Sequence, residues 1–122
     1  MGRVGAMICE QGDIVSINFD PSQRHEPAGR HYAIVISPWE INRMSALTVV
    51  VPVTSTDNGY PLHVRLSDDD PIYGFAQCEA IRAMDLGARE ARGGVEVVGS
   101  VDDATLADIL ARVLVVIGFE EI

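Results

Sequence analysis

The stretch GDIVSINFDPSQRHEPAGRHYAIVISP, residues 12–38, sets two apolar segments on either side of a polar one. Along residues 12–19 the side chains alternate in character, which predicts a β-strand with two different faces. Residues 32–37 are apolar almost throughout and rich in β-branched side chains, which is typical of a central strand. The sequence therefore predicts two strands joined by a loop that carries many charged and titratable side chains.

Short apolar segments continue this pattern through the first hundred residues. They predict strands at residues 46–54, 62–66, 75–81 and 93–101. Residues 38–44 begin with proline, a favourable first residue of a helix, and predict a short helical turn. Pro52 indicates a strand end or a bulge, because proline cannot donate to a ladder, and Asn58-Gly59 predicts a turn.

The apolar spacing changes after residue 101 to that of an α-helix. Asp102 is placed to cap the N-terminus, and Gly118 to end the helix, so we predict a helix over residues 102–117. Its apolar stripe is expected in the core. The stripe consists of Leu106, Ile109, Leu110, Val113, Leu114 and Ile117. The expected fold class is mainly β: a small barrel or coiled antiparallel sheet with a C-terminal helix, in one domain over residues 1–122.

Composition limits the class of protein. The chain has 122 residues, 48% of them hydrophobic, which suffices to bury a core, and it has no apolar run long enough to span a membrane. The N-terminal segment is unlike a signal peptide, so a cytoplasmic protein without a membrane partner is expected. The formal net charge of −9 is unfavourable for nucleic-acid binding, but charge is nearly balanced over residues 24–65. All nine cationic side chains are arginine, which suits bidentate phosphate recognition.

Three further side chains have ordinary structural interpretations. Cys9 and Cys78 are expected to be free thiols, and Cys78 lies in an apolar run that predicts a buried, inert thiol. His63 lies on an alternating strand and is expected at the surface.

The loop between the first two strands concentrates its titratable groups at its C-terminal end. Arg24, His25, Glu26, Arg30 and His31 fall within eight positions. Cleavage of RNA by its own 2′-hydroxyl needs a group that removes the hydroxyl proton, a group that protonates the leaving oxygen, and donors that stabilise the charged phosphorane. The loop contains these residue types and needs no metal for that chemistry. A solvated loop with surface ion pairs explains the same composition.

Two other kinds of site receive less support. A zincin helix needs two histidines one turn apart, whereas His25 and His31 are six residues apart with Pro27 and Gly29 between them. A serine nucleophile has no surrounding G-x-S-x-G turn, although a Ser/His pair remains open. We therefore expect neither a metal nor a cofactor.

The segments GDIVSINFDPSQRHEPAGRHYAIVISP, VVVPVTS, GYPLHVRL and AMDLGAR together resemble the MazF/PemK/Kid family of bacterial toxins. The resemblance covers residues 11–117 in matching order and spacing. It implies an SH3-like barrel with a C-terminal helix, a homodimer, and a metal-independent, sequence-specific endoribonuclease that acts on single-stranded RNA. It also implies a MazE/PemI-type antitoxin partner, whose extended acidic segment covers the RNA site.

Position by position, the resemblance implies catalytic roles for several residues. His25 and Glu26 match the acid or base of the family's loop, and Thr54 matches a threonine implicated in catalysis and phosphate binding. His31 stands where the family has its catalytic arginine, and Arg30 lies one place earlier. We expect His31 to transfer a proton and Arg30 to bind the phosphate.

On a later strand, one branch of the family has an arginine and an aspartate around a cysteine, where this chain has Gln77 and Glu79. The candidate RNA-binding residues are thus Arg24, Arg30, Ser55, Gln77 and Glu79. Because two cations of the family pattern are missing, a second hypothesis is a catalytically weakened protein of the same fold. Such a protein would act through antitoxin binding and operon regulation.

Overall fold

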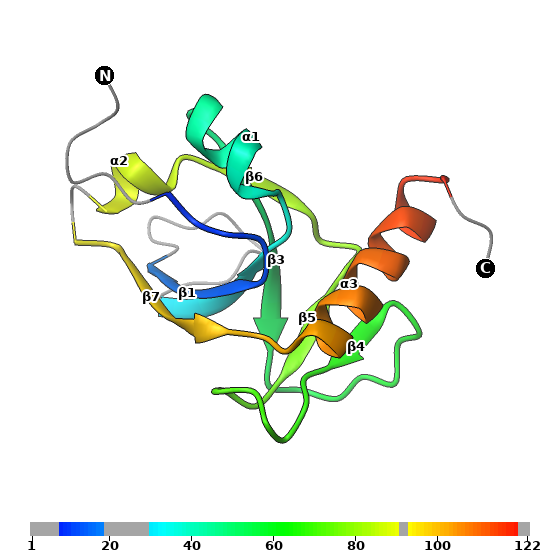
Figure 1. Ribbon diagram of the computed structural model, residues 1–122. Coiled ribbons are helices and arrows are strands. Elements are labelled where there is room, and N and C mark those ends of the chain that lie inside the picture. The colour runs from blue at the N-terminus through cyan, green and yellow to red at the C-terminus, as the bar shows by residue number, and fades with distance from the viewer. Residues whose placement is uncertain (1–7, 19–29, 91–92, 120–122) are drawn as a thin grey trace, which may run out of the picture.

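The structure is a computed structural model and describes residues 8–18, 30–90 and 93–119. One antiparallel sheet of seven strands dominates it (Figure 1). The strands are β1 (Asp13–Asn18), β2 (Arg30–Val35), β3 (Thr48–Thr54), β4 (His63–Arg65), β5 (Phe75–Gln77), β6 (Arg82–Met84) and β7 (Val95–Ser100). The helices in the described ranges are α1 (Trp39–Met44), α2 (Leu86–Glu90) and α3 (Asp103–Val116). None of these helices is long and apolar enough to cross a membrane.

The sheet follows the order β4-β5-β3-β2-β1-β7, and β6 pairs with β3 off this path. The strands curve around one another, but β4 and β7 remain at opposite ends of the order and do not pair (Figure 1). The mainly β fold class with a C-terminal helix is confirmed. Of the two expected forms the coiled sheet is correct, because the described strands do not close into a barrel.

Strand β3 changes partners along one of its edges. Its first half, Thr48 to Val50, pairs with β6, and its end, Val53 and Thr54, pairs with β5. Pro52 lies between these two pairings, where a residue without an N–H removes no ladder hydrogen bond. The strand thus continues through Pro52, which pairs with Ala33 of β2. Instead of the expected strand end or bulge, β3 changes its partner on the other edge at this residue.

Both faces of the sheet bury apolar side chains. On one face Ile14, Ile34 and Val51 pack with Ile109 of α3. On the other face Val15, Val35 and Val50 pack with side chains from β6, α2 and β7. The second cluster consists of Cys9, Val15, Ile17, Ala33, Val35, Val50, Met84, Leu86 and Val95.

Helix α3 begins and ends where the sequence predicts. The Asp102 carboxylate accepts a hydrogen bond of 2.7 Å from the Thr105 N–H, and Gly118 has a φ of 82° just after the helix. The apolar stripe faces the core at Ile109. Its last member, Ile117, is 64% exposed, which corrects the expectation that the whole stripe is buried. Ile117 is already the C-cap residue, at the end of the helix.

The region after β5 differs most from the sequence-based expectation. The strand predicted over residues 75–81 ends at Gln77, where Ala80 donates back to the Gln77 carbonyl in a turn. The next two elements, β6 and α2, have three and five residues, too few for their periodicity to be recognised. The Asp85 carboxylate accepts from the Ala88 N–H at 2.9 Å, as a capping residue does.

Candidate functional site

A hollow of about 280 Å³ opens at the junction of β2, β3 and β5. Its walls combine an imidazole, two hydroxyls and an amide with two buried apolar residues. The lining residues are His31, Pro52, Val53, Thr54, Ser55 and Gln77. A concave surface with a few converging polar groups on an apolar floor is typical of a binding site.

The strand register brings these residues together. Ala33 pairs with Pro52, so His31, two residues before Ala33, lies on the same face of the sheet as Pro52. On the other side of β3, Val53 pairs with Ala76, which places Gln77 next to Pro52. Three strands that are separated in sequence thus supply one surface, and the site depends on the fold rather than on a local motif.

Gly74 allows β3 and β5 to approach closely at this point. A side-chain carbon at Gly74 would lie 2.5 Å from Val53 Cγ1 and 2.9 Å from the Thr54 carbonyl oxygen. Any larger residue would displace the end of β3. The absence of a side chain at Gly74 therefore permits the close approach of β5 to the end of β3, where Thr54 lies at the rim of the hollow.

The two hydroxyl residues at the end of β3 retain hydrogen-bonding capacity. Thr54 Oγ1 accepts a hydrogen bond of 3.2 Å from the Thr56 N–H, and no described group accepts its proton. Among the described residues, neither the Ser55 hydroxyl nor the Gln77 side-chain amide has a hydrogen-bond partner. The hollow therefore offers donors to a ligand, as an anionic or polar substrate requires.

Arg30 lies outside this hollow. Its Nη1 donates to the Ser16 carbonyl at 2.9 Å and to the Ser16 hydroxyl at 3.0 Å, and its Nη2 donates to the Gly93 carbonyl at 3.1 Å. Successive strand residues point to opposite faces, so Arg30 and His31 diverge. Of the two neighbours that the sequence singles out, only His31 lines the hollow.

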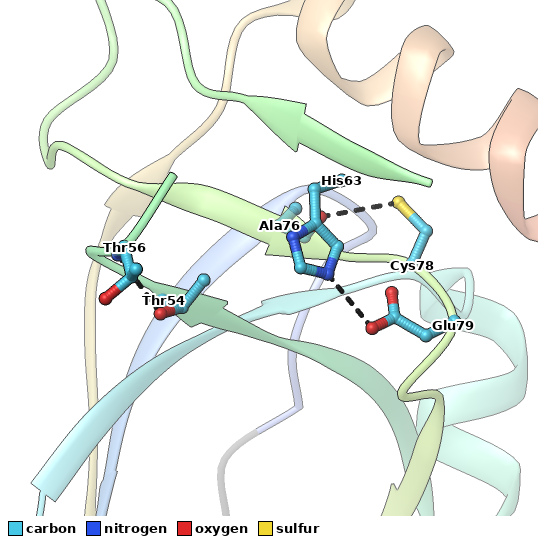
Figure 2. A network of polar contacts seen from close by, with 6 residues as sticks. All are labelled: Thr54, Thr56, His63, Ala76, Cys78 and Glu79. Carbon is cyan, nitrogen blue, oxygen red and sulfur yellow. Dashed lines mark hydrogen bonds and ion pairs between the residues drawn. The ribbon is translucent and has the colours of Figure 1, made fainter. Parts of the chain in front are cut away.

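Glu79 and His63 form a pair beside the hollow (Figure 2). His63 Nε2 lies 3.0 Å from Glu79 Oε2, and the two side chains are 6% and 33% exposed. His63 is also the cross-strand partner of Gln77. The expectation that His63 lies at the surface is wrong, because Glu79 and the ring of Tyr60, whose centroid is 5.2 Å away, cover the imidazole.

Three of the predicted site residues, Arg24, His25 and Glu26, lie outside the described residues. Both cysteines are free, as predicted, and both are buried, which was predicted only for Cys78. Burial raises the pKa of the Cys78 thiol to about 12, and that of Cys9 to about 11, so both stay protonated at neutral pH. Among the described residues, no group of three or more His, Cys, Asp or Glu side chains is arranged to hold a metal ion.

Sequence reasoning did not identify the apolar floor or the role of His63. The sequence marks Pro52 only as a strand end or a bulge and Val53 as an ordinary strand residue, because only the pairing with β2 and β5 places them in the hollow. The position of His63 becomes apparent only through its cross-strand partner Gln77, which follows it by fourteen residues in the sequence. The available signal was that His63, Gln77 and Glu79 all lie on adjacent predicted strands.

Comparison with known proteins gives one consistent family. Residues 10–117 match the family described as the PemK-like, MazF-like toxin of type II toxin-antitoxin system. The chain is 32% identical to the endoribonuclease toxin MazF of Escherichia coli strain K12 over 115 residues, which covers 94% of this chain and 99% of the relative.

Solved structures agree with this match. The crystal structure of MazF from Deinococcus radiodurans superposes with a TM-score of 0.80 at 28% identity, covering 92% of this chain and 98% of the other. A MazE-MazF structure from the same organism gives a TM-score of 0.78 at 25% identity, covering 93% and 99%. The chain therefore belongs to the PemK-like, MazF-like family of toxins of type II toxin–antitoxin systems.

Proposed function

We propose that this chain is an endoribonuclease toxin that cuts single-stranded RNA at specific sequences without a metal ion. The observation that carries the proposal is that His31, Thr54, Ser55 and Gln77 line one hollow in a chain of this family. Its curated relative MazF is an endoribonuclease toxin. Since the relatives span nearly the whole chain, the proposed activity belongs to this domain as a whole.

The proposed reaction is attack of a ribose 2′-oxygen on the adjacent phosphorus. The P–O5′ bond breaks, and the products are a 2′,3′-cyclic phosphate and a 5′-hydroxyl. His31 gives a proton to the leaving 5′-oxygen, while the Thr54 and Ser55 hydroxyls donate to the phosphate oxygens. The loop residues Glu26 and His25 are the proposed acceptors of the 2′-hydroxyl proton.

Phosphate binding by arginine stays a prediction. Arg30 already donates to Ser16 of β1 and to Gly93, which lies two residues before β7, so its described contacts hold β2 to these two segments. Arg24 is the other proposed cation. The described residues that line the hollow include no arginine.

We also propose the partners that the family resemblance implies. A MazE/PemI-type antitoxin would cover the hollow with an extended acidic segment, as carboxylates suit the same donors that hold a phosphate. The D. radiodurans relative is known in a MazE-MazF structure, which supports such a partner. A homodimer and a cytoplasmic location, where messenger RNA is translated, complete the proposal.

The second candidate function is a catalytically weakened toxin that acts through its antitoxin and regulates its operon. The observation that favours it is the lining itself, in which Gln77 stands where a branch of the family has a cation. Such a protein would bind the antitoxin and leave RNA intact.

The test is to incubate the purified protein with a long RNA in the presence of EDTA and to map the cut ends. The proposal predicts cuts at a recurring sequence, with a 5′-hydroxyl and a 2′,3′-cyclic phosphate at each. Intact RNA together with tight antitoxin binding would support the second candidate. Cutting that stops in EDTA and returns with a divalent cation would contradict the metal-independent mechanism.

A further inference from the structure

The His63–Glu79 pair has an arrangement that the proposed cleavage chemistry does not use. The Glu79 carboxylate is one third exposed, while the imidazole that binds it is buried to 6% exposure. Among the described residues, Glu79 is the only side chain that accepts or donates a hydrogen bond at His63, because Nδ1 is buried without a partner. The ring therefore has one polar function in the fold, which is to hold this carboxylate.

The hydrogen-bond pattern defines the state of the pair. A donor is needed at Nε2 to satisfy the carboxylate, so this nitrogen carries a proton in the pair. Tyr60 packs edge-on against the ring and limits its rotation. One oxygen of Glu79 is thus held by His63. The other lone pairs of the partly exposed carboxylate can accept hydrogen bonds from a ligand.

The pair adjoins the hollow through Gln77. His63 pairs across the strands with Gln77, which lines the hollow, and Glu79 follows Gln77 by two residues. Figure 2 shows the imidazole between the β5 backbone at Ala76 and the Glu79 carboxylate. The pair therefore lies at the β5 rim, across from the hydroxyls that end β3.

A carboxylate held in place repels a phosphate but can accept hydrogen bonds from a nucleobase. Like charges at close range repel, so the RNA backbone avoids Glu79. Amino groups of bases, by contrast, donate to carboxylates, as cytosine N4 does to Glu and Asp in nucleic-acid complexes. Uracil offers a single N–H that lies between two carbonyl oxygens, and both of these repel a carboxylate.

We propose that the His63–Glu79 pair reads one base next to the cleaved bond, and that it selects a base with an amino group over uracil. Glu79 is the specificity-determining residue, and His63 is the positioning residue that orients it. This inference rests on the proposed function and gives it a source of sequence preference. Single-stranded RNA presents its base edges to proteins in this way.

The test compares cut sites in a randomised RNA pool for the parent protein and three variants. In Glu79→Gln the amide can donate to a uracil carbonyl, so the share of cuts with uracil at the selected position should rise about tenfold. His63→Leu should lose the same preference, whereas His63→Gln, which keeps a donor toward Glu79, should retain more of it. Glu96→Gln, a change at an exposed residue of β7, should leave the preference unchanged.

The outcomes separate the inference from the proposed function. If the parent cuts RNA and Glu79→Gln cuts the same sites, the inference is wrong while the function stands. A Glu79→Gln variant that cuts nothing would also overturn it, because a base-reading contact changes which sites are cut. A general loss of folding would lower the cleavage rate at every site by the same factor. If His63→Leu does not fold, the cut sites of Glu79→Gln alone test the inference. A parent protein that cuts no RNA would reject the proposed function, and this inference with it.

Discussion

Two polar clusters of this protein differ in how their hydrogen bonds are used. At the N-terminus of α3, Asp70 Oδ1 accepts from the Asp102 N–H at 2.7 Å, and Asp70 Oδ2 accepts from the Ser67 N–H at 2.8 Å and from the Thr105 hydroxyl at 3.1 Å. At the hollow, the Thr54 hydroxyl proton and the Gln77 amide have no described partner.

The difference separates structural polar groups from functional ones. Partly buried polar groups are normally paired within the fold, so the cluster around Asp70 is explained by stability alone. Donors that remain unpaired on a concave surface gain nothing for the fold and become useful only when a ligand arrives. Changes at the two clusters should therefore alter different measurements, activity at the hollow and stability at α3.

The largest effect is expected from Thr54→Val. This change keeps the shape of the side chain and removes its donor, so RNA cleavage should fall about a hundredfold. The free energy of unfolding should change little, since the lost bond to Thr56 is an exposed turn contact. Cleavage rate and urea unfolding measure the two quantities. The matched change Thr56→Val lies outside the hollow and should leave cleavage intact; equal losses in both variants would break the comparison.

Asp70→Ala should lower the stability of the fold and leave cleavage nearly unchanged. It leaves three donors without their acceptor at the start of α3, so the free energy of unfolding should fall by about 2–3 kcal/mol. Cleavage per folded molecule should stay within twofold of the parent. The neighbouring Asp69→Ala removes an exposed carboxylate and serves as the control. A stability loss at Asp69 as large as that at Asp70 would argue against a specific clamp.

A smaller effect is expected from the cap at Asp102. The Thr105 N–H, followed by the hydroxyls of Thr105 and Ser67, lowers the pKa of this carboxyl. A lowered pKa stabilises the fold above the unfolded-state pKa, and that contribution is lost as the pH falls through the folded-state value. Asp102→Asn keeps a capping side chain that does not titrate. Its stability should decline less steeply than the parent's below about pH 4, as measured by thermal unfolding across pH; parallel curves would contradict this.

The fold could be predicted where one pattern persisted over many residues. Helix α3 was found from its spacing and from Asp102 and Gly118, because a helix of fourteen residues leaves a clear period. Strand β3 was found despite Pro52. The short elements β6 and α2 were missed, since three or five residues carry no recognisable period.

The candidate site could be predicted only in part. Resemblance to a family pointed to His31 and Thr54, and both line the hollow. The direction of Arg30 toward Ser16 and the burial of His63 against Glu79 depend on the register of neighbouring strands. The sequence alone does not show which strands pair or in which register. The neighbours of each side chain are therefore known only from the structure.

The most direct test of the central claim is the single-turnover cleavage rate of His31→Ala, measured together with its free energy of unfolding. Tyr32→Ala is the control, because the adjacent strand residue points to the opposite face. If the hollow is the catalytic site, His31→Ala should lose about 10²–10⁴-fold in rate while its stability stays close to that of the parent and Tyr32→Ala keeps its activity. A His31→Ala variant that cleaves RNA as fast as the parent would contradict the assignment of catalysis to this hollow.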